Sequence, residues 1–101
     1  MIHVLAFITA KPGRRDEILA AFRANVPAVR AEDGCIEYGA AVDVEPGGDA
    51  ARFGADTFVV IEKWASEAAL AAHAKAPHML AYREKTAGLI ASRAVHVLTP
   101  A

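Results

Sequence analysis

Residues 59–79 read VVIEKWASEAALAAHAKAPHM and decide the fold, because they hold a strand, a turn and helical sequence in quick succession. The stretch begins with an apolar strand that carries Glu62 and Trp64. The strand stops at Ser66, a residue type that favours the N-cap of a helix, and the helix that follows bears His73. A carboxylate, an indole and an imidazole are therefore expected on adjoining elements.

The strand in this stretch is expected to present one face to the core. Side chains alternate along a strand, so the face that holds Glu62 and Trp64 also holds Phe58 and Val60. A carboxylate on an otherwise apolar face is costly to bury unless it is paired. We therefore expect the chemistry of this protein near Glu62.

The helical part of the stretch is expected to break at Pro77, because the residue before a proline is displaced from the helical region. Pro77 suits the first turn of a second helix, which places His78 at its start. Four residues then follow at helical spacing, and a last strand is expected after them. These are Met79, Tyr82, Thr86 and Leu89, followed by a strand over 93–99.

The first half of the chain predicts a strand, a helix and a second strand. Residues 2–10 are apolar on both parities, which is typical of a strand buried on both sides. The acidic pair at 16–17 favours the first turn of a helix, in which Pro27 predicts a kink or a break. The turn Glu32-Asp33-Gly34 is expected to close that helix. The remaining elements are a strand over 35–44, a loop over 45–56 and a strand over 57–64.

This order, β-α-β-β-α-β, is the split βαβ or ferredoxin-like pattern of the α+β class. It predicts a four-stranded antiparallel sheet that carries its helices on one face. The strands show apolar residues on both parities, so the other face also needs a cover. A second copy of the same sheet is the simplest cover, and the pattern therefore predicts a homodimer.

The composition of the chain limits the classes of protein to which it can belong. The chain has 101 residues, 54% of them hydrophobic and 23% charged, which favours a single globular domain over residues 1–101. A net charge of −1 argues against nucleic-acid binding. The one cysteine allows no intrachain disulfide and no cysteine-based zinc site. No run is long enough to span a membrane, and the N-terminal sequence does not match a signal peptide, so a cytoplasmic protein is expected.

His73 and Glu62 are the candidate catalytic residues. Imidazole is the best general base available near neutral pH, and Glu62 on the opposing strand could accept a proton or fix the tautomer of His73. Structural roles stay open for both: a satisfied core histidine, and a carboxylate paired with a backbone amide or with Arg83. Trp64, the only tryptophan, is expected either as a core residue or as a flat wall for an aromatic ligand.

Five further residues are expected to bind substrate around the same pocket. His78 and Tyr82 lie four positions apart on one helix face and would line its rim. Tyr38, on the second strand, would bond a hydroxyl or simply pack. Asn25, on the apolar stripe of the first helix, would face the ligand or satisfy the carbonyl orphaned by the nearby proline. Met79 completes the set.

The sequence predicts neither a metal site nor an internally bound cofactor. Glu62, His73 and His78 match no standard ligand spacing. The chain has no glycine-rich phosphate loop, nucleophile elbow or dinucleotide fingerprint. A flavin or a nicotinamide would also be large for so small a domain.

At these residues the chain resembles the antibiotic biosynthesis monooxygenase family, and within it the bacterial quinol monooxygenases. The specific part is the combination of E-x-W on a strand with H-x-x-x-P-H on the helices after it. Haem-degrading relatives carry an Asn on the first strand, where this chain has about Ala6, which argues against haem. The matching pieces cover nearly the whole chain: VPAVRAEDGC (26–35), VD (42–43), VVIEKWAS (59–66) and LAAHAKAPHMLAY (70–82).

The resemblance implies a dimeric α+β barrel that oxidises a quinol or polycyclic phenol, a small aromatic substrate, with O₂ and without metal or organic cofactor. It implies a pocket between sheet and helices in which His73 takes the phenolic proton, Glu62 orients His73 and Trp64 stacks on the ring. Two alternatives stay open. One is an isomerase acting on a small polar substrate, and the other is a non-catalytic dimer that binds a small molecule.

Overall fold

The computed structural model describes all 101 residues and has the predicted order of elements, with the second helical region split in two. The sheet is antiparallel throughout, with strand order β2-β3-β1-β4. This is the ferredoxin-like α+β fold, so the predicted fold class is confirmed for the single chain. The elements are β1 (Ile2–Ala10), α1 (Arg15–Arg30), β2 (Cys35–Ala41), β3 (Thr57–Trp64), α2 (Glu67–Lys75), α3 (Pro77–Thr86), the 3₁₀ helix η1 (Ala87–Leu89) and β4 (Ile90–Leu98).

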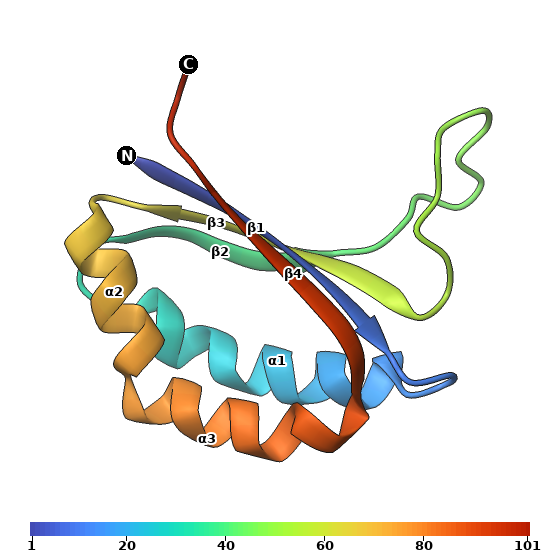
Figure 1. Cartoon of the computed structure of the whole chain (residues 1–101), viewed down its shortest axis with the longest axis horizontal. Coiled ribbons are helices and arrows are strands. Elements are labelled where there is room, and N and C mark those ends of the chain that lie inside the picture. The colour runs from blue at the N-terminus through green and yellow to red at the C-terminus, as the bar shows by residue number, and fades with distance from the viewer.

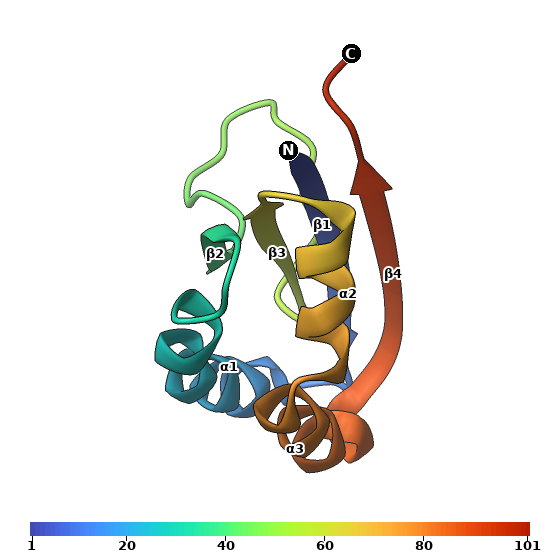
Figure 2. The same cartoon turned by 90° about the vertical axis from the view of Figure 1, so that its left-hand side faces the viewer.

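All three helices lie on one side of the sheet (Figures 1 and 2). On β1 the even-numbered residues Val4, Ala6 and Ile8 face the helices and are buried. Their partners on β3 are Glu62, Val60 and Phe58, so the predicted alternation of β3 is confirmed. The core therefore forms between this face and the helices.

No helix covers the opposite face of the sheet. Leu5 and Phe7 on β1 are only half-buried, and Ile61 on β3 is exposed. Phe7 contacts the rings of Phe53 and His96, with centroids 5.4 and 5.6 Å away. The prediction that β1 is buried on both sides is thus met on one side only, and an apolar surface remains on the other.

Helix α1 differs from its prediction because it continues through Pro27 to Arg30. A proline removes one backbone hydrogen bond and crowds the carbonyl four residues before it, here that of Arg23. Both Pro27 and Arg23 lie on the exposed side of the helix, where water can solvate that carbonyl. The predicted break at Pro27 was therefore wrong, whereas a kink there stays a prediction.

Gly34 does not close the helix directly, since α1 is capped at Ala31. Instead it allows a close crossing between the turn after α1 and the start of α2. Its φ is +82°, and a Cβ at this position would lie 2.6 Å from the Cβ of Ala69. Only glycine combines this backbone conformation with that approach.

The second strand is shorter than predicted. β2 ends at Ala41 rather than at Val44, and the pairing register shifts between Cys35 and Glu37. The extra residue of such a bulge turns Ile36 out of the alternation, so it is exposed while Tyr38 is buried. The last strand is longer than predicted, since β4 begins at residue 90 rather than at 93.

The joint between α2 and α3 forms as the sequence predicts. Ser66 caps α2 by accepting a hydrogen bond from the backbone N–H of Ala69 at 3.1 Å. Ala76 leaves the helical region with φ −61° and ψ 139°, and Pro77 then opens α3. On one continuous helix, His73 and His78 would point about 140° apart. The joint changes the helix direction between them and lets both rings reach the same place.

Candidate active site

A cavity of about 490 Å³ lies between the helix-covered face of the sheet and helices α2 and α3. Fourteen of its nineteen lining residues are apolar, so it suits an apolar guest. Val95 and Val97 of the edge strand β4 line it yet stay about half exposed, which marks its open side. Five predicted site residues line it: Glu62, His73, Tyr38, Met79 and Tyr82.

Glu62 reaches the cavity from β3 and is almost fully buried. One of its oxygens, Oε1, accepts a hydrogen bond from Nε1 of Trp64 at 2.9 Å. Burial raises the pKa of Glu62 above its ordinary value; the Trp64 hydrogen bond and the charge of His73 oppose this rise, and the charge of Glu32 adds to it. Glu62 is therefore a carboxyl group tuned toward holding a proton.

Glu62 does not orient His73, contrary to the expectation from the resemblance. The nearest atoms, Nε2 of His73 and Oε1 of Glu62, lie 3.9 Å apart, which is too far for a hydrogen bond. The alternative pairing of Glu62 with Arg83 is also absent, since Arg83 donates to the carbonyl of Ala74 at 2.8 Å.

The carboxylate that binds His73 is Glu32, a residue that sequence reasoning treated only as part of a turn. Its Oε2 lies 2.8 Å from Nδ1 of His73 and 2.8 Å from Nε2 of His78. The side chain of Glu32 is 13% exposed, so this contact is well shielded from water. In the sequence, Glu32 in a Glu-Asp-Gly turn is typical of the end of a helix. The only signal was its place inside the segment VPAVRAEDGC that carries the resemblance.

Trp64 lies behind the cavity rather than in its wall. Its side chain is fully buried and is not among the lining residues. The indole packs against His73 with ring centroids 4.5 Å apart and planes tilted by 36°. The structure therefore gives Trp64 contacts with both acid–base residues, in place of the expected contact with substrate.

Two tyrosines contribute neutral hydroxyl groups to the lining. Tyr38 stacks on Phe22 with centroids 5.0 Å apart and meets His73 edge-on at 5.6 Å. Burial, followed by the charge of Glu62, raises the pKa of Tyr38 far above its ordinary value. Burial also raises the pKa of Tyr82 to about 12. Both side chains are therefore phenols rather than phenolates at neutral pH.

The remaining predicted residues lie around this lining. Asn25 is not part of it; its Nδ2 donates to Sδ of Met79 at 3.3 Å rather than to the carbonyl freed by the proline. His78 is also outside the lining and binds Glu32. Met79 is thus the member of this group that faces the cavity, with Asn25 behind it.

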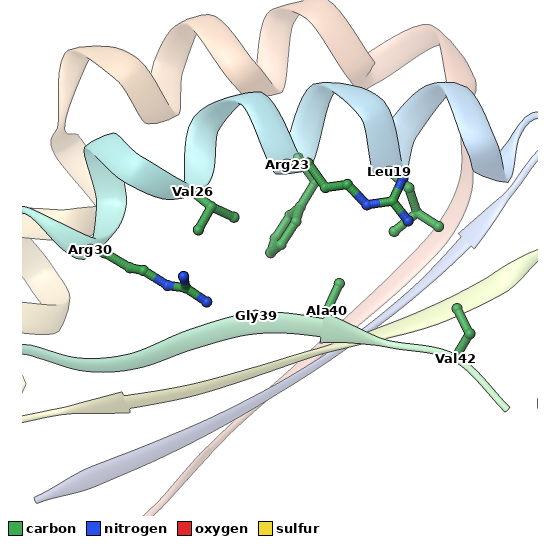
Figure 3. Close-up of a pocket in the computed structure, with 8 residues that line it drawn as sticks. Leu19, Arg23, Val26, Arg30, Gly39, Ala40 and Val42 are labelled. Carbon is green, nitrogen blue, oxygen red and sulfur yellow. The ribbon is translucent and has the colours of Figure 1, made fainter. Parts of the chain in front are cut away.

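A second cavity, of about 340 Å³, lies between α1 and β2 (Figure 3). Two arginines extend into it, Arg23 and Arg30, above a floor of small and apolar residues. The guanidinium of Arg30 is engaged, since it donates twice to the carbonyl of Tyr38 at 3.1 and 3.2 Å. This cavity contains no residue with acid–base character near neutral pH, so we place the candidate site in the larger one.

The arrangement in the larger cavity can perform proton transfer beside an apolar guest. His73 offers a ring nitrogen on the side of Glu62, and both groups are shielded from water. Low exposure strengthens the electrostatic interactions of these groups with a bound molecule. No group of three or more His, Cys, Asp and Glu residues could hold a metal ion.

A family model described as antibiotic biosynthesis monooxygenase matches residues 1–85. The chain belongs to this family. The Escherichia coli K12 protein named "Probable quinol monooxygenase YgiN" is 37% identical over 102 residues, which cover 99% of this chain and 98% of that protein. Family and relative together support a monooxygenase, and hence an oxidoreductase enzyme.

Solved structures of similar proteins share the fold over nearly the whole chain. PA3566 from Pseudomonas aeruginosa is 29% identical with a TM-score of 0.83, covering 99% of this chain and 93% of its own. Rv0793 from Mycobacterium tuberculosis is 31% identical with a TM-score of 0.81, covering 99% and 94%. None of the helices combines the length and the apolar character needed to cross a bilayer.

Proposed function

We propose that this protein is a cofactor-independent monooxygenase that oxidises a quinol or a polycyclic phenol with O₂. The observation that carries the proposal is an apolar cavity of about 490 Å³ whose lining includes the acid–base pair His73 and Glu62. Its volume falls in the range of roughly 300–1,000 Å³ typical of small-molecule sites. Membership of a monooxygenase family and similarity to a protein named as a quinol monooxygenase support the same reaction.

The chemistry needs little more than a base and a dry cavity. His73 takes the phenolic proton, and the resulting electron-rich phenolate passes one electron to O₂. The radical pair then recombines to form a carbon–oxygen bond. Cleavage of the O–O bond releases the second oxygen atom as water. For a reduced naphthoquinone the balance is quinol plus O₂ giving hydroxynaphthoquinone plus water, and the substrate supplies all four electrons.

The other lining groups hold the ring and the protons in place. Glu62, whose pKa is raised by burial, can donate the proton that the departing water requires. Tyr38 and Tyr82 remain neutral and can donate hydrogen bonds to a quinone or quinol oxygen. Exclusion of water protects the radical pair from side reactions.

The uncovered face of the sheet supports a homodimer. Leu5, Phe7 and Ile61 form a contiguous apolar surface around the β1–β3 pairing, and soluble monomers rarely expose such surfaces. Ile61→Lys should therefore shift sedimentation from dimer to monomer. The matched control is Leu80→Lys, which alters an equally apolar and more exposed residue on α3 and should leave the dimer intact. A monomeric wild-type protein would refute this assembly.

The assay for the reaction is O₂ consumption with a reduced naphthoquinone, with product mass measured after reaction under ¹⁸O₂. We expect one labelled oxygen in the product and one O₂ used per substrate. His73→Gln should lower kcat by about 10²–10⁴-fold, the usual contribution of a general base. His3→Gln, which alters a histidine on the opposite face of β1, should leave kcat within twofold. No rate above background across a panel of quinols and phenols would reject the proposal.

An isomerase acting on an anionic substrate is the second candidate, because Arg83 and Arg93 both line the cavity. Two guanidinium groups would suit a phosphate or a carboxylate. The apolar majority of the lining favours the aromatic substrate instead. Conversion of a phosphorylated sugar without O₂ uptake, lost in His73→Gln, would favour the isomerase. Binding without turnover, unchanged in His73→Gln, would indicate a non-catalytic protein.

A further inference from the structure

One oxygen atom of Glu32 is shared by two histidines that come from different helices. Oε2 lies 2.8 Å from Nδ1 of His73, near the end of α2, and 2.8 Å from Nε2 of His78, at the start of α3. The side chains of His73 and Glu32 are 6% and 13% exposed. Bulk water therefore does not compete effectively for this oxygen.

The shared oxygen fixes where the ring protons lie. An ionised carboxylate only accepts hydrogen bonds, so each nitrogen facing it must carry a proton. A neutral His73 must then be the Nδ1–H tautomer, and a neutral His78 the Nε2–H tautomer.

The consequence for His73 is that Nε2 carries the lone pair. This nitrogen lies on the side of Glu62, 3.9 Å from Oε1, and both side chains line the cavity. Oε1 is already engaged by the indole N–H of Trp64 at 2.9 Å. Nε2 therefore has no protein hydrogen-bond partner and is free to accept a proton from a guest molecule.

We propose that Glu32 is a positioning residue that holds His73 as the Nδ1–H tautomer, so that Nε2 acts as the base in the cavity. This inference rests on the proposed function for its catalytic consequence, but the tautomer itself can be observed without any substrate. His78 has a supporting role, because its N–H keeps Oε2 of Glu32 in place.

The direct test is a ¹⁵N–¹H correlation spectrum of the imidazole rings, with ¹⁵N-labelled wild-type protein at pH 9, where free imidazole is neutral. His73→Gln and His78→Gln assign the signals. We expect a protonated Nδ1 with a bare Nε2 for His73, and the opposite pattern for His78. An Nε2–H tautomer of His73, or an even mixture of the two forms, would overturn the inference.

The catalytic consequence is tested with two substitutions of Glu32 and a control. Glu32→Leu removes the acceptor, so the His73 signal should become a mixture of tautomers and kcat should fall about 10- to 100-fold, less than loss of the base itself. Glu32→Gln keeps a carbonyl oxygen as acceptor, so it should fold, retain the Nδ1–H tautomer and recover part of that loss. KM should stay within twofold in both variants. Glu37→Gln alters an exposed carboxylate paired with Lys63 and should change neither signal nor rate.

The outcomes separate the two proposals. The expected tautomers together with inactivity toward every quinol and phenol would reject the proposed function and leave the positioning of His73 standing. An active wild type whose Glu32→Leu variant folds and keeps both its tautomer and its kcat would reject the role of Glu32 and leave the function standing. A 10- to 100-fold rise of KM in Glu32→Leu, with kcat unchanged, would likewise contradict a role of Glu32 in positioning the base.

Discussion

Gly34→Ala is the substitution whose cost follows most directly from the structure. Gly34 adopts a φ of +82°, which is unfavourable for any residue with a Cβ. The added methyl group would also lie 2.6 Å from the Cβ of Ala69 in the first turn of α2. Two separate penalties are therefore expected, one from the backbone and one from the collision.

The two penalties can be estimated separately. A left-handed conformation costs a non-glycine residue about 1–2 kcal/mol. Overpacking by one methyl group costs about 1–3 kcal/mol. Gly34→Ala should thus lower the free energy of unfolding by about 2–5 kcal/mol, out of a total of roughly 5–15 kcal/mol for a domain of this kind. Gly13→Ala provides the backbone penalty alone, because Gly13 has a φ of +76° and nothing within 4 Å of an added Cβ.

The assay is urea denaturation followed by the fluorescence of the single buried tryptophan, Trp64. The decisive variant is Gly34→Ala/Ala69→Gly, in which the methyl group at position 69 is removed. If the collision is real, the double variant should be more stable than the sum of the single changes predicts, by about 1–3 kcal/mol. Additivity within about 0.5 kcal/mol would refute the steric argument.

Two further predictions concern Glu62 and Ser66. Because folding raises the pKa of Glu62, the native state holds a proton that the unfolded state has released, and wild-type stability falls as pH rises from the unfolded pKa through the folded one. Glu62→Gln cannot titrate at this position. The free energy of unfolding of the variant minus that of wild type should therefore increase between pH 4 and pH 8, by about 1.4 kcal/mol for each unit of the pKa shift. Urea titrations followed by circular dichroism measure this difference, and a pH-independent difference would contradict the prediction. Ser66→Ala removes the N-cap of α2 and should cost about 0.5–2 kcal/mol, whereas Ser92→Ala, on the exposed β4, should change stability by less than about 0.5 kcal/mol in the same experiment.

Much of the fold could be predicted because its signals are local. The alternation of residues 57–64, the cap at Ser66 and the break before Pro77 each depend on a few neighbouring residues, and all three are confirmed. The break at Pro27 was wrong because the outcome at a proline depends on the solvent exposure of the helix side that carries it. The exposure of Ile36 was missed because the register shift between Cys35 and Glu37 leaves no mark in the apolar pattern.

The site was predicted less completely because its key contacts are distant in sequence. Glu32 and His73 lie 41 positions apart, and nothing in either neighbourhood indicates the other. Trp64 was correctly placed on the inward face of β3. Strand alternation does not show, however, whether a side chain on that face lines the cavity or lies behind its lining.

The alternation of β1 gives one short strand two sets of positions that can evolve separately. Val4, Ala6 and Ile8 border the cavity, whereas Leu5 and Phe7 belong to the surface on the reverse side. A mutation at an even-numbered position can change the shape of the cavity, and so which molecule fits, without disturbing the reverse side. A mutation at an odd-numbered position can change the reverse surface without altering the cavity. Descendants of such a chain can therefore change the cavity while keeping the reverse surface of the strand, a freedom that comes from the pleat itself.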